Sequence, residues 1–358
     1  MDRLGLVGLP NSGKSSLFNA LTGGSALVAP HPFSTTETEV GVAHVPDPRL
    51  DALAAMSESK RVVPATFEVV DIGAVQKSTE RGEGLGSRFL AGIREVEALA
   101  LVLRSFHDEA APGEEDPVEA LATLELELVL ADASSLEAQL ERASRRRAAS
   151  DPALAAALDA APAALEVLHG GTPLYRSTLD TKAREQLRPL FLLTTKPLLV
   201  VVNVGEDDLG SEEAADAVRT QLGEAAEVLT VSVQLEAEAA KLDAAERKEM
   251  LEGLGLGEGA LVRVARAGWS ILGRSTFFTT GDKESRAWVF RTGAKAPECA
   301  GVIHSDLQRG FIKADVIAWD ELLAAGSFAA ARAKGKVRLE GKDYVVADGD
   351  VLEIRFNV

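Results

Sequence analysis

Residues 8–15 read Gly-Leu-Pro-Asn-Ser-Gly-Lys-Ser and match the pattern G-x-x-x-x-G-K-[ST]. A short apolar run at residues 3–7 precedes this stretch, and a helical pattern follows from Ser16 to Leu21. The sequence thus predicts a strand, a glycine-rich loop and a helix. Glycines let successive backbone N–H groups point at phosphate oxygens, and the start of a helix adds positive partial charge. The stretch therefore predicts a nucleotide-binding P-loop in an α/β domain.

The side chains of this loop have distinct expected roles. Lys14 is expected to reach the β and γ phosphates and to stabilise charge in the transition state, and the Ser15 hydroxyl to ligate Mg²⁺. Asn11 is a candidate to help hold a monovalent cation, K⁺, near the phosphates, with plain loop structure as the alternative. No residue beyond Lys14 is assigned to catalysis. The nucleotide-binding residues predicted in the loop are Asn11, Ser12, Gly13, Lys14, Ser15 and Ser16.

Two further segments are expected to complete the magnesium site. The β-rich run at residues 66–71 ends in Asp71, whose carboxylate suits the shell of a Mg²⁺ ion. The loop at residues 32–36 ends in two threonines, and the residues alone do not choose between Thr35 and Thr36.

The sequence does not identify the residue that orients the attacking water. Ras-like enzymes place a glutamine directly after a D-x-x-G motif. The equivalent position here is the apolar Val75, and Gln76 lies one residue further on. We therefore expect slow hydrolysis unless a cation, backbone groups or a partner assists.

The base-reading element is predicted at residues 203–206, directly after the apolar run 198–202. Guanine readers use N-K-x-D, in which the aspartate accepts hydrogen bonds from N1–H and the 2-amino group of guanine. Val204 and Glu206 replace that lysine and aspartate, whereas the Asn203 amide can pair with N6 and N7 of adenine. Losing one such pairing costs on the order of 1–3 kcal/mol, so the sequence favours ATP over GTP. The nucleotide-binding residues predicted outside the phosphate loop are Asn203, Val204, Glu206, Ser232 and Val233.

Strands alternate with helical stretches along much of the chain, which indicates a doubly wound, mostly parallel sheet. Residues 98–103 and 198–202 are uniformly apolar, as expected for strands buried on both faces. Over residues 117–195, leucine and alanine recur at three- and four-residue steps, which predicts an inserted α-helical hairpin with breaks at Pro162 and at the Gly170-Gly171 pair. Residues 277–358 are rich in Thr, Val and Gly and predict a small strand-dominated module.

The net charge of −17 over 358 residues comes mainly from two segments. Residues 108–150 and 205–260 contribute −7 and −11, and the remainder is close to neutral. This composition excludes a non-specific polyanion binder, because phosphate binding needs clustered lysine and arginine. The one cysteine, Cys299, excludes an intramolecular disulfide and a cysteine-rich zinc site, and we expect it to be a buried structural residue.

The chain lacks the patterns of membrane insertion and export. No uninterrupted apolar stretch reaches the ~18 residues of a membrane span. The N-terminus enters a strand-like run without the basic region and apolar core of a signal peptide. We therefore expect a cytoplasmic chain without a membrane partner.

Two basic runs are candidate RNA contacts, each with a solvated surface as the alternative. The first lies in the helical insertion and consists of Arg142, Arg145, Arg146 and Arg147. The second lies around a predicted strand of the C-terminal module, which would place its cations on one face. It consists of Arg332, Lys334, Lys336 and Arg338.

Together, these motifs resemble the Obg-like ATPase (YchF) family of P-loop proteins over nearly the whole chain. Besides residues 8–15, the resemblance is carried by Pro32-Phe33-Ser34-Thr35, Val45-Pro46-Asp47-Pro48-Arg49-Leu50, Gly82-Glu83-Gly84-Leu85-Gly86, Asn203-Val204-Gly205-Glu206 and Leu339-Glu340-Gly341-Lys342-Asp343-Tyr344.

The resemblance implies an OBG-type G domain over residues 1–275, interrupted by the helical insertion at 117–195, and a β-grasp-like TGS domain over 276–358. It implies a switch that binds ATP and ADP in preference to guanine nucleotides and associates with ribosomes. It selects Thr35 as the magnesium-side threonine. The alternatives are a ribosome- or RNA-binding module gated by nucleotide with negligible hydrolysis, and a GTPase.

Two departures from the family pattern concern hydrolysis. The family usually reads D-I-A-G where this chain has Asp71-Ile72-Gly73-Ala74. Alanine resists positive φ at roughly 1–2 kcal/mol, so the change concerns γ-phosphate sensing and hydrolysis rate more than nucleotide binding. Many members carry a histidine after the strand that ends near Arg104, where this chain has Pro112-Gly113. No catalytic histidine is therefore carried over.

Overall fold

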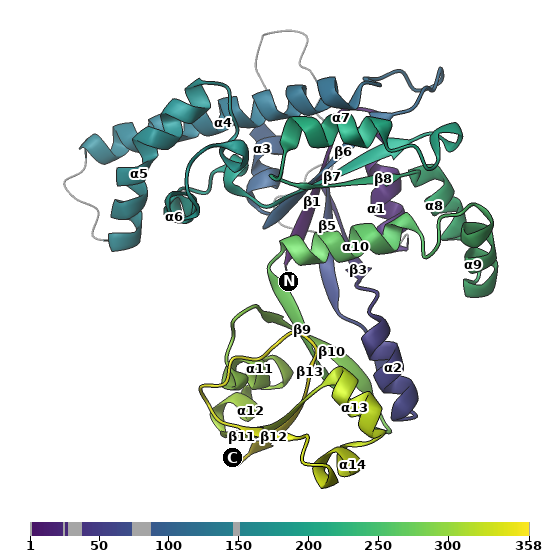
Figure 1. Cartoon of the computed structure of the whole chain (residues 1–358). Coiled ribbons are helices and arrows are strands. Elements are labelled where there is room, and N and C mark those ends of the chain that lie inside the picture. Colours follow the sequence, from purple (N-terminus) through teal and green to yellow (C-terminus); the bar gives the residue numbers. More distant parts are fainter. Residues whose placement is uncertain (1, 24–25, 28–37, 74–86, 146–150, 358) are drawn as a thin grey trace. The chain divides into compact units, whose positions relative to one another are not determined.

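The computed structural model describes the chain apart from residues 1, 24–25, 28–37, 74–86, 146–150 and 358 (Figure 1). The chain divides into two compact units. Unit 1 comprises Met1–Ala43 and Glu68–Leu272, and unit 2 comprises His44–Phe67 and Gly273–Val358. In the described part of the chain, no helix combines the length and apolar character needed to cross a membrane.

Unit 1 is built on a seven-stranded sheet with the strand order β2-β3-β5-β1-β6-β7-β8. The neighbours from β5 to β8 pair in parallel, and β2 pairs antiparallel with β3. The predicted doubly wound, mostly parallel sheet is confirmed. The strands are β1 (Arg3–Val7), β2 (Ala26–Leu27), β3 (Thr38–His44), β5 (Thr66–Ile72), β6 (Ala98–Ser105), β7 (Leu198–Val204) and β8 (Glu227–Val231).

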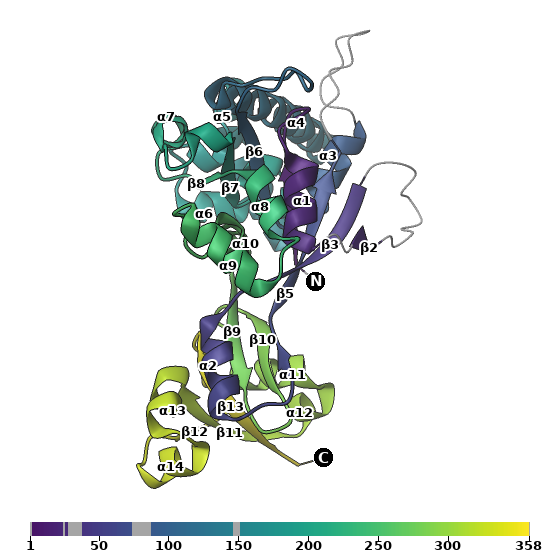
Figure 2. The same ribbon diagram turned by 90° about the vertical axis from the view of Figure 1, so that its right-hand side faces the viewer.

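The central strands are apolar without alternation because helices cover both faces of the sheet. Strand β7 is buried along its whole length. One face packs against α3 (Ser87–Arg94), α4 (Pro117–Arg145) and α7 (Glu213–Leu222). The other face packs against α1 (Lys14–Thr22), α8 (Val233–Ala239) and α10 (Ala260–Ile271), with α9 (Ala244–Gly253) beside α8 (Figure 2).

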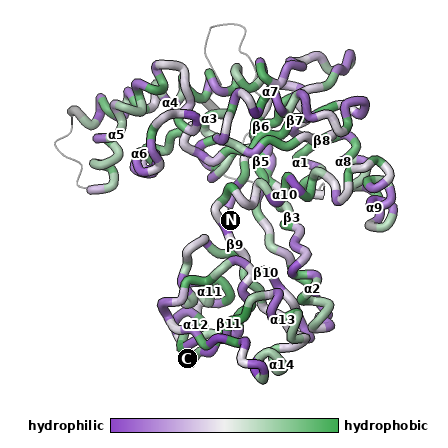
Figure 3. Tube along the Cα trace, viewed as in Figure 1, coloured by the Kyte–Doolittle hydropathy of each residue, from purple (hydrophilic) through white to green (hydrophobic). Residues whose placement is uncertain are grey.

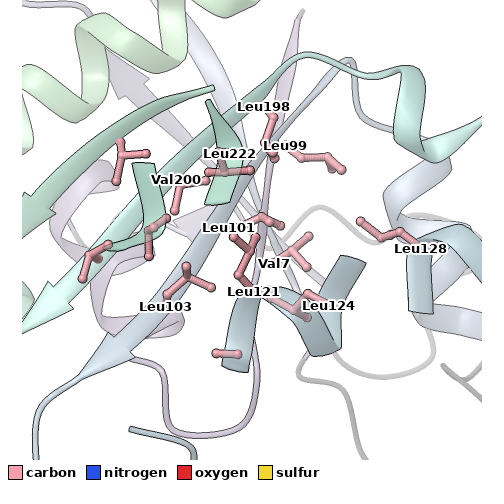
Figure 4. Packing of buried hydrophobic residues seen from close by; sticks show 14 of the residues in the cluster. Val7, Leu99, Leu101, Leu103, Leu121, Leu124, Leu128, Leu198, Val200 and Leu222 are labelled. Atoms are coloured by element: carbon pink, nitrogen blue, oxygen red, sulfur yellow. The ribbon is translucent and has the colours of Figure 1, made fainter. Parts of the chain in front are cut away.

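The core on the first face joins the helical insertion to the sheet. Figure 4 shows Leu121 and Leu124 of α4 in one cluster with Val7, Leu101 and Leu103 of the strands, and all five are at most 1 % exposed. Burying each leucine stabilises the fold by roughly 1.5–3 kcal/mol. The start of α4 is therefore fixed on the sheet.

The insertion forms the predicted pair of packed helices, α4 and α5 (Pro152–His169), followed by α6 (Thr181–Gln186) and one-turn helices. The predicted break at Pro162 is wrong, because α5 continues through that residue. The predicted break at Gly170-Gly171 is confirmed, because α5 ends at His169 and Gly170 is its C-cap. Buried Asp132 of α4 accepts hydrogen bonds from the backbone N–H groups of Leu193 and Thr194 at 2.8 and 2.7 Å, which ties the helix to the chain returning to β7. Figure 3 contrasts the hydrophobic strands of the sheet with the hydrophilic α6 and α9.

Unit 2 contains a six-stranded sheet with the order β12-β11-β13-β9-β10-β4. Its strands are β4 (Val62–Val63), β9 (Arg274–Thr279), β10 (Ser285–Arg291), β11 (Phe311–Ala318), β12 (Arg338–Glu340) and β13 (Asp350–Phe356). Its helices are α2 (Pro48–Met56), α11 (Ala296–Ile303), α12 (Ser305–Arg309), α13 (Trp319–Ala325) and α14 (Phe328–Ala333). Cys299 is fully buried in α11, as expected, and burial raises the pKa of its thiol to about 12.

Residues 44–67, which the expected boundaries place in the G domain, group with unit 2. Asp47 caps α2 by accepting from the N–H of Arg49, and Pro48 occupies the first helical turn. The Arg49 guanidinium donates to Asp348 at 2.6 Å and lies over the Phe278 ring. The stretch Val45–Leu50, one carrier of the family resemblance, thus contains a link between α2 and the C-terminal sheet.

Candidate nucleotide-binding site

The phosphate loop joins β1 to α1 and depends on two glycines. Gly13 caps α1 in a left-handed conformation with φ of 87°. A Cβ atom at Gly13 would lie 2.2 Å from Nδ2 of Asn203, and one at Gly8 would lie 2.7 Å from the carbonyl oxygen of Val102. Both positions therefore exclude side chains, which explains the glycines of the motif.

Lys14 and Asp71 form a buried ion pair at the mouth of this loop. They are 5 % and 6 % exposed, so both charges are nearly removed from water. The predicted phosphate-binding cation and the predicted magnesium-shell carboxylate are thus brought together. A buried pair of this kind is held by mutual attraction, and removal of either partner leaves an uncompensated charge.

A cavity of about 540 Å³ lies over the phosphate loop. It is lined by the predicted residues Asn11, Ser12, Gly13, Lys14, Ser15, Ser16 and Asp71, and also by Leu9, Asn19, Glu39 and Gly73. Asn19 follows Ser15 and Ser16 by about one helical turn, so helical spacing could have identified it. Glu39 carried no such signal, because it lies 24 positions beyond Ser15 in the sequence.

Asn203 links the phosphate loop to the loop after β8. Its amide Nδ2 donates to the carbonyl oxygen of Ser12 at 3.0 Å, and its Oδ1 accepts from the N–H of Val233 at 3.1 Å. One N–H and one lone pair of the amide remain for a base. The sequence reasoning gave Asn203 only the base-reading role and missed this bridging role.

The remaining base-site residues are spread over two places. Ser232 caps α8 and is 5 % exposed, whereas Glu206 is exposed on the one-turn helix Glu206–Asp208. Val204 is buried and lines a different cavity of about 340 Å³, with Asp116 and Asp208. The structure therefore does not bring the Val204 side chain to the phosphate-loop cavity.

Two buried hydroxyls support a ligand at this site. Among the described residues, three side-chain hydroxyls are buried without a hydrogen-bond partner, namely Oγ of Ser12, Oγ of Ser232 and Oγ1 of Thr230, and the first two lie at the phosphate loop and at the start of α8. An unsatisfied buried polar group is costly and calls for a partner. Both hydroxyls belong to loops that Asn203 joins, so a polar ligand between these loops would satisfy them.

The donor set also fits Mg²⁺. Ser15 offers an exposed hydroxyl and Asp71 a carboxylate, and both line the same cavity. Oxygen donors are the ligands that Mg²⁺ prefers, and it commonly takes few protein ligands with phosphates and water completing the shell. No cluster of three or more histidine, cysteine or acidic side chains suited to a metal occurs within the described ranges. The third predicted ligand, Thr35, lies outside the described residues, as do Thr36, Ala74, Val75, Gln76 and Gly82–Gly86.

Of the two basic runs, the second differs from its predicted form. In the first, Arg142 is exposed on α4, and Arg146 and Arg147 lie outside the described residues. The predicted single strand for the second run is wrong. Its residues span the end of α14, a turn and the start of β12, because Arg332 and Arg338 belong to different elements.

Three of the four cations of the second run are also paired with carboxylates of unit 2. Arg332 donates to Asp315, and Lys336 pairs with Glu321 at 3.1 Å. Arg338 reaches Asp350 at 3.4 Å. These contacts reduce the positive charge that the run offers to RNA.

Comparisons with known proteins agree with this architecture. A family described as "50S ribosome-binding GTPase" matches residues 3–147. The family YchF-GTPase_C, described as "Protein of unknown function (DUF933)", matches residues 275–357. The "Ribosome-binding ATPase YchF" of Bacillus subtilis is 43 % identical over 361 residues, covering 99 % of each chain, and that of Haemophilus influenzae is 42 % identical over 360 residues with the same coverage.

A solved structure gives the same assignment. The structure titled "Structure of the Schizosaccharomyces pombe YchF GTPase" matches 99 % of this chain and 97 % of its own with a TM-score of 0.85 and 29 % identity. Full-length similarity at this identity, together with the phosphate loop, identifies the chain as a P-loop NTPase with a C-terminal TGS-like domain that belongs to the YchF family.

Proposed function

We propose that this chain binds ATP in preference to GTP, hydrolyses it slowly with Mg²⁺, and acts as a nucleotide-dependent switch that associates with the ribosome in the cytoplasm. The observation that carries the nucleotide assignment is the buried Lys14–Asp71 pair at a phosphate loop whose Ser12 hydroxyl has no hydrogen-bond partner. The relatives from B. subtilis and H. influenzae are named ribosome-binding ATPases, which supports the substrate and the partner.

In the proposed mechanism, the ion pair exchanges partners when nucleotide binds. The Lys14 ammonium turns from Asp71 to the β and γ phosphates, where it stabilises the charge that develops during transfer. Asp71 and Ser15 would hold Mg²⁺, together with Thr35. When bound, Mg²⁺ would neutralise the negative charge that develops on the phosphates. Backbone N–H groups at the start of α1 orient the phosphates.

We propose that base preference comes from the loop at Asn203 and Glu206. The remaining N–H and lone pair of the Asn203 amide match the acceptor and donor edge of adenine. Glu206 replaces the aspartate that guanine readers use, and it is one methylene longer. Asn11 also has a side-chain oxygen without a partner among the described residues, which could assist K⁺ near the phosphates.

Two alternative functions have specific support. The apolar Val75 in place of a glutamine favours a nucleotide-gated ribosome- or RNA-binding module with negligible hydrolysis of its own. The titles of the matched family and of the S. pombe structure name GTPases, which favours GTP as the substrate.

Single-turnover hydrolysis separates these functions. ATP and GTP should be compared with Mg²⁺ at varied K⁺, with and without ribosomes, and with Lys14→Ala as the background control. We expect slow ATP turnover that exceeds GTP turnover and rises with ribosomes. Faster GTP turnover would establish the GTPase, and no turnover above Lys14→Ala in any condition would establish the binding module.

A further inference from the structure

The connection between β6 and α4, residues 106–116, lies directly against the phosphate loop. Nδ2 of Asn11 donates to the carbonyl oxygen of Pro112 at 2.9 Å. A Cβ atom at Gly113 would lie 3.1 Å from the carbonyl oxygen of Pro10 and 3.7 Å from Cβ of Asn11. The backbone of residues 112–113 is therefore in contact with the turn at residues 10–11.

Asn11 sits at a conformationally sensitive point of this turn. Its φ of 62° is in the left-handed region, which asparagine tolerates better than most side chains but which still favours glycine. The hydrogen bond to Pro112 anchors this residue. Any shift of residues 112–113 therefore acts on the part of the phosphate loop that precedes Gly13 and Lys14.

Arg104 gives the connection its shape. It is the penultimate residue of β6 and is 1 % exposed. Nε donates to the Phe106 carbonyl at 2.9 Å, Nη1 donates to the Ala111 carbonyl, and the guanidinium lies 4.4 Å from the centre of the Phe106 ring. Nη2 reaches Glu115 at 3.4 Å. A buried guanidinium needs its donors satisfied, so the connection must wrap around this side chain.

The far end of the connection is the start of the helical insertion. Oδ1 of Asp116 accepts from the N–H groups of Val118 and Glu119 at 2.8 and 3.4 Å, which caps α4. A continuous series of contacts thus runs from Asn11 through Pro112 and the group around Arg104 to the first turn of α4.

We propose that residues 106–116, shaped by Arg104, position the phosphate loop and couple nucleotide binding to the first turn of α4. Arg104 and Gly113 are positioning residues in this account. The inference rests on the nucleotide site proposed above. Coupling of this kind is reciprocal. If bound nucleotide raises the affinity of the first turn of α4 for a partner, that partner raises the affinity for nucleotide by the same factor.

Gly113→Val tests the contact without changing a side chain of the phosphate loop. Gly113 has no left-handed φ, so the substitution acts through its crowded contacts with Pro10 and Arg104. Gly253→Val is the matched control, because a Cβ atom there meets nothing within 4 Å. Loss of one hydrogen bond predicts a roughly 3- to 10-fold weaker affinity for MgATP in Gly113→Val and no change in the control.

Amide hydrogen exchange distinguishes coupling from a merely structural role of residues 106–116, because a structural role would not make exchange at the start of α4 depend on nucleotide. In the unmodified chain, MgATP should slow exchange at the amides of residues 118–121. In Gly113→Val this nucleotide-dependent difference should disappear, although β7 stays protected. Persistence of the difference in Gly113→Val, or its absence in the unmodified chain, would overturn the coupling.

Arg104→Lys gives a second and independent variant. Lysine keeps the charge but cannot make the forked contacts of a guanidinium, so the KM for ATP should rise by a similar factor and the exchange difference should again be lost. Unchanged KM and exchange would contradict the role of Arg104. If Lys14→Ala still binds nucleotide, the proposed site itself is wrong; if Lys14→Ala abolishes binding but Gly113→Val matches the unmodified chain, only the coupling fails.

Discussion

Lys14 of the phosphate loop and Arg332 of unit 2 are both cations held by carboxylates, but their surroundings differ. Lys14 is 5 % exposed and faces one carboxylate, that of Asp71, in a cavity that also holds an unsatisfied hydroxyl. The Arg332 side chain is 44 % exposed and is shared between Asp315 and Glu353. In the proposed function, the first pair exchanges partners when phosphate and Mg²⁺ arrive, whereas the second is already satisfied. A cation in the sequence is therefore available to a ligand only if its own partner can be released.

The largest expected effect comes from removing the exchangeable cation. Lys14→Ala should weaken nucleotide binding by more than ~100-fold, because hydrogen bonds to charged groups contribute about 1.5–3 kcal/mol each and the ammonium is expected to make at least two. It should also destabilise the nucleotide-free chain by about 3–5 kcal/mol, because Asp71 remains buried without its partner. Titration calorimetry and urea unfolding measure the two effects.

The double variant Lys14→Met with Asp71→Asn serves as the control. It replaces the ion pair by neutral groups of similar volume, so stability should largely recover while nucleotide binding stays absent. Recovery of binding in the double variant would show that the ion pair is structural and not part of the site.

A change at the base-reading loop sharpens the account of specificity. Val204→Lys with Glu206→Asp restores the N-K-x-D pattern and should shift the ATP-to-GTP affinity ratio toward GTP by ~10- to 100-fold, since each base contact is worth about 1–3 kcal/mol. Competition binding with the two nucleotides measures the ratio. An unchanged affinity ratio would show that this loop does not read the base. Lys14→Ala is the comparison, because it should lose binding of both nucleotides equally.

The satisfied cluster of unit 2 is expected to respond to acid. Burial opposes ionisation of Asp315, but hydrogen bonds from Arg355 and Arg332 outweigh it and lower the pKa of its carboxyl. Because the folded-state pKa lies below the unfolded value of ~3.9, this carboxylate stabilises unit 2 above that pH, and the stabilisation is lost as the pH falls through the folded pKa. Asp315→Asn should therefore cost about 1–3 kcal/mol at pH 7 and progressively less toward pH 2.

Tryptophan fluorescence follows this effect in a Trp269→Phe background, because the remaining tryptophans, Trp288 and Trp319, both belong to unit 2. Arg332→Ala is the comparison and should cost ~0–1 kcal/mol as a surface ion pair. A constant difference between the Asp315→Asn variant and its parent from pH 7 to pH 2 would be inconsistent with the ionised carboxylate as the source of the stability.

The smallest effect is expected at the C-terminal basic run. Lys336→Ala with Arg338→Ala should change ribosome association by less than about twofold, because both cations are paired within unit 2. Cosedimentation with ribosomes at two salt concentrations measures this. A severalfold loss that depends on salt would reinstate the run as an RNA contact.

Much of the fold was predictable because local patterns and packing agree. The uniformly apolar runs of β6 and β7 predict strands covered on both faces, and the leucine spacing of α4 predicts the inserted helices. The phosphate loop was predictable for a different reason. Gly8 and Gly13 are required sterically, and Lys14 follows at a fixed position, so the motif itself encodes the local geometry.

The features that the sequence did not predict depend on contacts between residues far apart in the chain. Residues 44–67 join the C-terminal sheet through Arg49 and Asp348, which are 299 positions apart. The bridge from Asn203 to Ser12 spans 191 positions. The basic run at residues 332–338 was predicted as a strand because its alternation mimics one, although α14 ends within it. No local pattern reports which carboxylate neutralises a given cation.

Equilibrium binding of MgATP and MgGTP to the full chain, measured side by side with Lys14→Ala as reference, tests the central claim most directly. We predict that ATP binds more tightly than GTP by at least severalfold, and that Lys14→Ala binds neither nucleotide at concentrations that saturate the unmodified chain. Tighter binding of GTP, or undiminished ATP binding by Lys14→Ala, would contradict the account.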